Sequence, residues 1–229
     1  IAPYRSLSQA HATDPVIRAA GSAGGVVTAL LLSALEQGLI DAALVVENDA
    51  SDPTRPRLTV ARTPEAICAA AQSKYCLAPV NSFLDQIPEG NDRLGIVALP
   101  CQAHGFQLAR SLNLDIARRT TFVIGIFCGF NVKHEGTTYL LRKLGIRSEE
   151  VATLEHRGGP WHGGFRVVTR DGREGFIAKH QYTYVLLMYA PEGCWYCPDL
   201  AAEFADVSVG DYWVGDARGC SMVIGRTVA

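Results

Sequence analysis

Two short, uninterrupted runs of apolar residues constrain the fold of this chain more than any other feature. The runs are Leu94–Leu99 and Phe122–Phe127. A strand with one face in water alternates apolar and polar residues, whereas a strand without that alternation is covered on both faces. Strands of this kind are typical of a parallel sheet between layers of helices. We therefore expect an α/β fold with a mixed, mainly parallel sheet and flanking helices.

The rest of the N-terminal half supplies the other elements of such a layer. Gly25–Gly38 is rich in Ala and Leu, which predicts a helix that stops at Gly38. A second helix is expected over Pro64–Ala71, because Thr63 can cap it and proline suits its first turn. Two further strands are expected at Ala42–Val46 and Leu58–Ala61.

The pattern changes after Glu155, where a glycine-rich loop begins. Beyond it, Phe165–Thr169 and Gly175–Ala178 flank Asp171-Gly172, which predicts a β-hairpin. We place a boundary near residue 90, so that 1–90 and 91–229 form two lobes of one compact unit.

Composition excludes several classes of protein. The 229 residues are 48% hydrophobic and carry a formal net charge of -2, which indicates a globular chain and gives no basic surface for nucleic acid. The longest apolar stretch, Val26–Leu35, is shorter than the ~20 residues of a membrane span. Ile1 in place of Met indicates a processed or truncated chain, and such a chain can lack cofactor ligands from either end. No secretory leader is visible, and the odd number of cysteines favours a reducing compartment, so we expect a cytoplasmic protein.

Four of the seven cysteines form the strongest chemical signal. Cys101 and Cys128 each come directly after one of the two apolar runs. Because parallel strands end at the same edge of a sheet, these two thiols can face one site. Cys194 and Cys197 form a C-x-x-C pair, a spacing that lets two thiolates share a metal or cluster. The sequence therefore predicts a four-cysteine site, with Cys68, Cys76 and Cys220 as structural residues.

Other interpretations of these cysteines remain open from the residues alone. A single cysteine after an apolar strand is often a small buried side chain, and a C-x-x-C pair serves zinc, iron–sulfur clusters and redox dithiols alike. An all-sulfur set without a histidine pair favours a soft metal centre.

A second signal is the run of small residues Gly21–Thr28 at the start of the first long helix. Free N–H groups at such a helix start can hold a phosphate, although a glycine-rich turn often has no ligand. Ser73-Lys74-Tyr75 adds a cation and an aromatic ring suited to a nucleotide cofactor, unless Lys74 is simply a surface residue.

Taken together, seven motifs resemble the coenzyme F420-reducing hydrogenase and dehydrogenase β-subunit family. The resemblance extends in order from about Tyr4 to Thr227 and is most specific in the last third. The motifs are Gly24–Leu31, Ser73–Tyr75, Pro100–Gln102, Phe127–Gly129, Cys194–Asp199, Glu203–Gly210 and Ser221–Thr227.

This resemblance implies an oxidoreductase subunit with FAD and a [4Fe-4S] cluster that reduces or oxidises coenzyme F420 by hydride transfer. A flavin is needed between the two because a cluster moves single electrons and a deazaflavin moves a hydride. The resemblance makes residues 1–90 a flavin-binding lobe and 91–229 an iron–sulfur lobe. By this resemblance, the cluster ligands are Cys101, Cys128, Cys194 and Cys197. The implied contacts of the FAD phosphates are Ser22, Gly24, Gly25 and Thr28. The implied further cofactor contacts are Ser73, Lys74, Tyr75 and Gln102, and Arg157 is implied to bind a phosphate or an acidic substrate tail.

The implied partners are coenzyme F420 or another small-molecule acceptor, and a redox partner subunit or ferredoxin. Many family members carry extra ferredoxin-like cysteines upstream that this sequence lacks, which leaves the electron route open. One alternative is a ferredoxin-dependent FAD/[4Fe-4S] reductase of another organic substrate, similar to the chlorophyll reductases. The other is a zinc-stabilised α/β module without a redox role.

Overall fold

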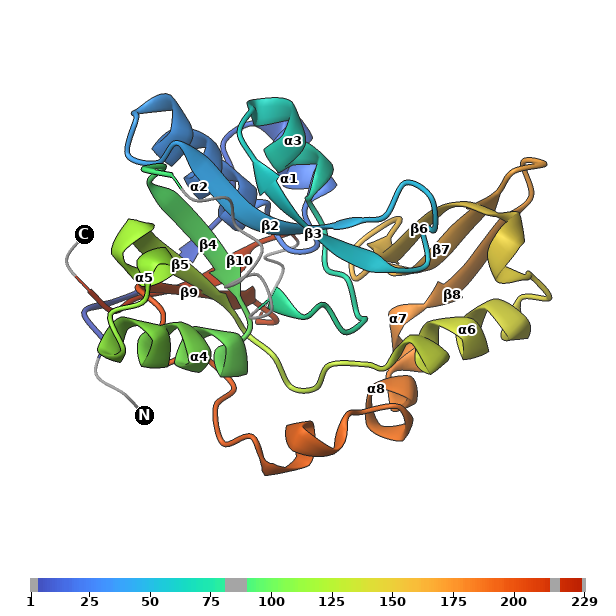
Figure 1. Cartoon of the computed structure of the whole chain (residues 1–229). Helices are drawn as coiled ribbons and strands as arrows, with labels where there is room; N and C mark the ends of the chain where they lie inside the picture. Colours follow the sequence, from blue (N-terminus) through green and yellow to red (C-terminus); the bar gives the residue numbers. More distant parts are fainter. Residues whose placement is uncertain (1–3, 81–89, 215–218, 228–229) are drawn as a thin grey trace.

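The structure is a computed structural model that describes residues 4–80, 90–214 and 219–227, and it contains two sheets (Figure 1). Ile1, which we interpreted as a sign of processing, lies outside these residues. The large sheet has seven strands in the order β1-β10-β9-β5-β4-β2-β3, and the small sheet has three in the order β6-β7-β8. Within the described residues no helix is long and apolar enough to cross a membrane.

The four central strands of the large sheet are parallel, as the apolar runs predict. They are β2 (Ala42–Asn48), β4 (Leu94–Ala98), β5 (Thr120–Ile126) and β9 (Val207–Asp211). Antiparallel strands close both edges of the sheet, and so the sheet is mixed. They are β3 (Pro56–Ala61) on one side, and β10 (Ser221–Gly225) followed by β1 (Ser6–Ala10) on the other.

Helices cover both faces of the large sheet. On one face lie α1 (Pro15–Ala20), α2 (Val26–Glu36) and α3 (Pro64–Ala69), and on the other lie α4 (Pro100–Ser111) and α5 (Asp115–Arg119) (Figure 1). Consecutive residues of β4 show the two cores: Ile96 packs with Phe106 on the α4 side, and Val97 packs with the cluster on the α2 side. This double burial explains why β4, and β5 from Phe122 onward, lack polar residues.

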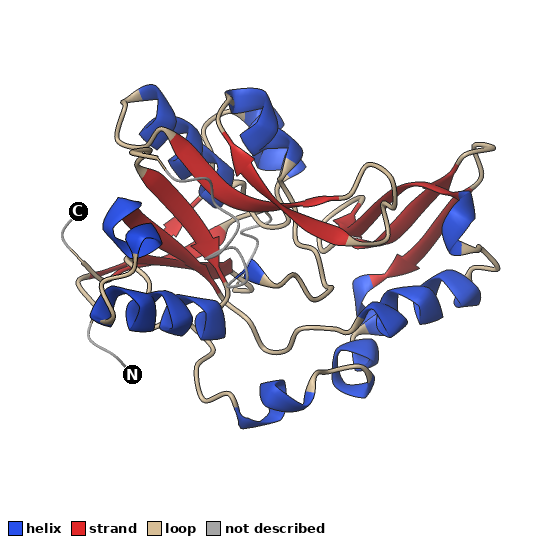
Figure 2. Cartoon of the chain, viewed as in Figure 1, coloured by secondary structure: helices blue, strands red, loops and turns tan. Residues whose placement is uncertain are grey.

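The small sheet has a core of its own. The expected hairpin forms from β7 (Gly164–Thr169) and β8 (Glu174–Ala178), and β6 (Val151–Gly158) adds a third antiparallel strand (Figure 2). Its helices are α6 (His134–Lys143), α7 (Lys179–Tyr182) and α8 (Tyr184–Met188). Two single turns, η2 (Ser148–Glu150) and η3 (Glu192–Tyr196), complete this half.

Local signals placed several helix ends correctly. Thr63 Oγ1 accepts a hydrogen bond from Ala66 N at 3.3 Å, as a capping residue should, although α3 ends at Ala69 rather than Ala71. The division near residue 90 stays a prediction. Hydrogen bonds between β2 and β4 join the chain on either side of that position.

Candidate functional site

The four predicted cysteine ligands come from three segments at the carboxyl edge of the central strands. Cys101 lies in the first turn of α4, directly after β4, and Cys128 follows β5. Cys194 is part of η3, and Cys197 follows that turn. A hydrogen bond of 2.9 Å from Cys128 N to Leu200 O fixes the C-x-x-C segment beside the end of β5. The topology therefore brings the four cysteines to one edge.

Electrostatic interactions show that these thiols are neighbours. Burial raises the pKa of the Cys128 thiol to about 12, and Cys101, Cys194 and Cys197 each contribute to the increase. Partial burial of its thiol also raises the pKa of Cys101, although the residue as a whole is exposed, and Cys197 and Cys194 contribute again. Two of the four, Cys101 and Cys197, are exposed. In the part of the chain that the structure describes, no three His, Cys, Asp or Glu side chains converge on a position for a single metal ion.

The donor set fits an iron–sulfur cluster. All four donors are soft thiols, the usual ligands of such clusters, and zinc accepts the same set. In a cluster each thiolate binds a different iron atom, and so the sulfur atoms need not converge on a single point.

Gln102 supports the turn that carries Cys101. Its Oε1 accepts a hydrogen bond from Leu99 N at 2.8 Å, and its Nε2 donates to Ala78 O at 3.0 Å. The first bond caps the start of α4, and the second ties that start to the segment after Cys76. Both ends of the Gln102 amide are therefore bound to backbone.

The glycine turn before α2 is tightly packed. Gly25 is the N-cap of α2 with φ +69°, and Gly24 has φ +88°. A Cβ at Gly25 would lie 2.4 Å from Ile17 O, and one at Gly24 would lie 2.8 Å from Gly219 O. Thr28, one turn into the helix, is buried. Close backbone packing thus requires both glycines whether or not a phosphate binds there.

Arg157 is the centre of a buried polar network. Its Nη1 lies 2.8 Å from Asp211 Oδ2 and 3.3 Å from the Tyr75 hydroxyl, and its Nη2 donates to Ser22 O at 3.0 Å. Its Nε donates to His162 O at 3.0 Å, and only 1% of the side chain is exposed. The network joins the turn before α2, the segment after α3 and the end of β9.

The Ser73-Lys74-Tyr75 motif borders the same network. Ser73 N donates to Ser22 Oγ at 2.8 Å, and Tyr75 contacts Arg157. Lys74 Nζ instead donates to carbonyl oxygens that follow α3, with bonds of 2.6 Å to Ala70 and Ala71. Burial lowers the pKa of Lys74 to about 8. The structure therefore groups Ser22, Ser73, Tyr75 and Arg157, and assigns Lys74 to the end of a helix.

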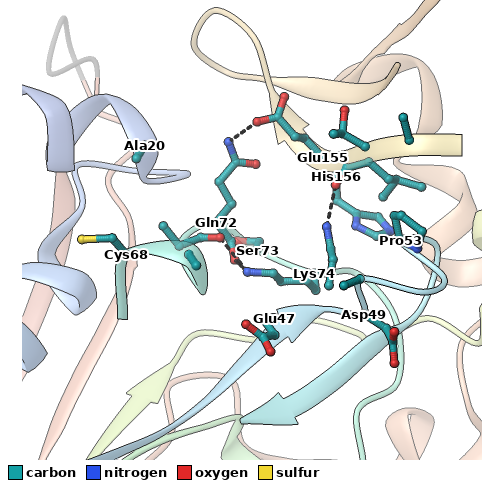
Figure 3. Close-up of a pocket in the computed structure, with 17 residues that line it drawn as sticks. Ala20, Glu47, Asp49, Pro53, Cys68, Gln72, Ser73, Lys74, Glu155 and His156 are labelled. Atoms are coloured by element: carbon teal, nitrogen blue, oxygen red, sulfur yellow. Dashed lines mark hydrogen bonds between the residues drawn. The ribbon is translucent and has the colours of Figure 1, made fainter. Parts of the chain in front are cut away.

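A cavity of about 630 Å³ lies between the segment after β2, the segment after α3, and β6 (Figure 3). Ser73 and Lys74 line it. Two polar atoms in its wall, Gln72 Oε1 and His156 Nδ1, are buried without a hydrogen-bond partner among the described residues. Burial, with a contribution from Lys74, lowers the pKa of His156 to about 3. The other polar lining residues include Glu47, Asp49 and Glu155.

Sequence reasoning missed two groups near Arg157. One is the pair of residues that precede it, the half-buried Glu155 and the buried His156, which line the cavity. The other is an aromatic cluster of Trp161, His162 and Trp213. The sequence does place two of the three tryptophans beside a glycine-rich loop or a strand end, which favours a functional role. It does not indicate that they meet, because they are far apart in the chain.

Comparison with known proteins identifies the class to which this fold belongs. Models of the family "Coenzyme F420 hydrogenase/dehydrogenase, beta subunit" match residues 7–85 for its N-terminal part and 91–229 for its C-terminal part. The chain belongs to this family, as its motifs imply, and is an oxidoreductase subunit by that membership.

Relatives agree with the family. The chain is 33% identical to a coenzyme F420 hydrogenase subunit beta from Methanothermobacter thermautotrophicus, over 98% of this chain and 78% of that protein. It is 30% identical to a coenzyme F420-dependent sulfite reductase from Methanocaldococcus jannaschii, over 90% of this chain and 33% of that protein. A chain in a solved F420-reducing [NiFe] hydrogenase complex from Methanosarcina barkeri superposes with a TM-score of 0.78 at 27% identity, covering 99% of this chain and 76% of that one.

Proposed function

We propose that this chain is an iron–sulfur flavoprotein subunit that passes electrons between a [4Fe-4S] cluster and FAD, and exchanges a hydride with coenzyme F420. When bound, the cluster supplies one-electron transfer and the flavin converts single electrons into a hydride. The observation that carries the proposal is the grouping of four thiols, from three segments of the chain, at one edge of the sheet.

The proposed cluster ligands are Cys101, Cys128, Cys194 and Cys197. Near neutral pH, the raised pKa of Cys128 keeps its thiol protonated. As a ligand it gives up that proton, because metals bind thiolate rather than thiol. Gln102 holds the turn on which Cys101 lies, and the hydrogen bond from Cys128 N to Leu200 O holds the C-x-x-C segment.

The proposed flavin contacts lie around the Arg157 network. Ser22 and Gly24 lie in the turn before α2, Gly25 is its N-cap and Thr28 lies in its first turn. The N–H groups and the dipole at a helix start favour phosphate. Ser73 and Tyr75 are fixed to that turn through Ser22 and Arg157. Because the Arg157 side chain is buried and fully engaged, we assign it the task of positioning Ser22 and Tyr75. Lys74 is then a neutralisable cation in the wall of the adjoining cavity.

The division into a flavin-binding lobe, 1–90, and an iron–sulfur lobe, 91–229, is part of this proposal. So is a redox partner subunit, which the M. barkeri hydrogenase complex supports because the similar chain there is part of an assembly. Coenzyme F420 is favoured as the small-molecule partner because both relatives are named for reactions with this coenzyme.

Anaerobic purification followed by analysis of bound iron, acid-labile sulfide, zinc and flavin tests the proposal. We expect about four iron atoms and one FAD per chain. Cys197→Ser should abolish the cluster, whereas Cys68→Ser, which alters an exposed thiol outside the four, should retain it. Zinc without flavin would contradict the proposal and identify a structural cysteine site.

Turnover separates the possible acceptors. The protein with its cofactors should oxidise reduced coenzyme F420 in the presence of a viologen dye as electron acceptor. If reduced ferredoxin reduces the protein and coenzyme F420 does not react with it, the protein is instead a ferredoxin-dependent reductase of another organic substrate.

A further inference from the structure

Three aromatic rings stack together beside the Arg157 network. The ring centroids of Trp161 and Trp213 are 5.5 Å apart with 33° between the planes, and those of His162 and Trp213 are 5.2 Å apart with 24°. Trp161 and His162 lie between β6 and β7, whereas Trp213 follows β9. Trp213 is 53% exposed, so this aromatic cluster reaches the surface instead of closing into a core.

Two cations lie against the rings of the aromatic cluster. Lys179 Nζ is 4.6 Å from the centroid of the Trp213 ring, and Arg157 Cζ is 5.6 Å from that of Trp161. One carboxylate, that of Asp211, faces both cations, at 2.8 Å from Arg157 and 3.7 Å from Lys179. These ionic groups therefore leave an excess of positive charge beside an exposed aromatic surface.

The aromatic cluster is also connected to the proposed flavin contacts. Arg157 binds His162 O with its Nε and reaches Tyr75 and Ser22 with its other nitrogens. Lys179 Nζ lies 5.9 Å from the centroid of the Tyr75 ring. A ligand held on the cluster would thus lie beside the residues assigned to the flavin.

We infer that Trp161, His162 and Trp213, with Lys179, form the docking surface for an exchangeable planar heteroaromatic ligand that carries acidic groups. This inference rests on the proposed function, in which such a ligand is the hydride acceptor. Stacking on aromatic side chains and attraction to a nearby cation are the interactions that bind planar anionic heterocycles.

We assign this surface to the exchangeable ligand and the enclosed side of the Arg157 network to the flavin, because Trp213 is half-exposed whereas the Arg157 side chain is only 1% exposed. Tightly held cofactors are mostly enclosed by protein. A half-exposed ring beside a cation instead allows a planar molecule to arrive from solvent and leave again.

Binding of coenzyme F420 to the FAD-loaded protein, measured by titration calorimetry, tests the inference. Trp213→Ala should weaken binding at least about tenfold, the effect expected when one stacking ring is removed. Iron and FAD per chain should stay unchanged, which also shows that the variant folds. Tyr4→Ala is the matched control: Tyr4 is 56% exposed but lies just before β1, outside the aromatic cluster and the cysteine site, and its removal should change the affinity less than about twofold.

A second variant tests the role of charge. Lys179→Gln should weaken binding of coenzyme F420 more than binding of a deazaflavin analogue without the acidic tail, and Lys179→Arg should restore most of the loss. Equal losses for both ligands would show that Lys179 has no part in recognising charge and would contradict that part of the inference.

Three outcomes would overturn the inference. One is unchanged F420 affinity in Trp213→Ala. Another is loss of FAD from that variant, because the surface would then belong to the resident flavin. The third is that the unaltered protein, holding FAD and iron, binds neither F420 nor riboflavin 5'-phosphate. If it fails to bind F420 but binds riboflavin 5'-phosphate in a Trp213-dependent way, the docking surface stands and only the proposed acceptor is wrong.

Discussion

Arg157 and Asp211 form an ion pair of 2.8 Å that joins the two sheets, because Arg157 lies in β6 of the small sheet and Asp211 ends β9 of the large one. The arginine side chain is 1% exposed and the aspartate side chain 20%. The same guanidinium binds Ser22 O, and so one side chain sets the position of the turn before α2 relative to both sheets.

Replacing Arg157 should therefore destabilise the whole protein. Arg157→Met leaves Asp211 without its closer cation and two carbonyl groups without a donor, which should lower the free energy of unfolding by about 3 kcal/mol. Urea denaturation measures this. Arg166→Met, which removes partly exposed pairs with Glu155 and Glu174, should cost less than about 1 kcal/mol. Equal costs for the two variants would show that the network is not a structural centre.

Gly25 and Gly38 provide a matched test of backbone packing. Both have positive φ, +69° and +65°, but only Gly25 has a close neighbour, Ile17 O at 2.4 Å from the position of an added Cβ. Gly38→Ala should cost about 1 kcal/mol, from the left-handed conformation alone. Gly25→Ala carries the same strain plus a backbone clash and should cost at least about 2 kcal/mol more. Thermal unfolding compares the two, and a similar loss in both would show that the turn can relax.

His156 should make the protein less stable in acid. Burial lowers its pKa to about 3, below its usual 6.5, so that between these values the unfolded chain binds a proton that the folded chain does not. This group therefore reduces stability as the pH falls below 6.5, by about 1.4 kcal/mol per pH unit at the steepest. In His156→Gln the acid limb of the stability profile, measured by urea unfolding from pH 4 to 7, should be flatter. The exposed His180→Gln should retain the slope, and a steep slope in both variants would assign it to other groups.

Gln102 allows its two hydrogen bonds to be separated. A glutamate side chain at this position can still accept from Leu99 N but cannot donate to Ala78 O. Gln102→Glu should therefore keep the helix cap, whereas Gln102→Ala loses both bonds and should cost about 1 kcal/mol more. Iron content should fall in parallel if the turn positions Cys101. Identical stability in both variants would mean that the cap contributes nothing.

The helices and strands that could be predicted are those whose burial or ends show in their own local sequence. β4 and β5 are covered on both faces, so each apolar run was visible without its neighbours. The hairpin β7–β8 carried its own turn, Asp171-Gly172, and Thr63 marked the start of α3. By contrast, β1 is an edge strand with an exposed, polar sequence that only its partner β10 stabilises. No local pattern indicates such a strand.

The candidate site follows the same rule. The cysteines were predicted as one site because two of them follow apolar strands and two have a recognisable spacing, and the structure brings them to one edge of the sheet. The tertiary contacts of Arg157, Trp161 and Trp213 were not predictable, because they arise where a loop of the small sheet meets the end of β9 in the large one. For the same reason the cavity at His156 was not visible, since its walls come from segments far apart in the chain.

The pairing of β1 with β10 also sets a limit on the order of folding. Ser6 to Ala10 lie opposite Gly225 to Ser221, so the first described strand of the sheet pairs only with the last one. On a ribosome, β1 waits for the 210 residues that separate Ala10 from Ser221 to be synthesised before β10 emerges. Such non-local pairing slows folding and leaves strand edges open to wrong partners in the meantime. During synthesis, β1 is the segment for which protection by a chaperone would matter most.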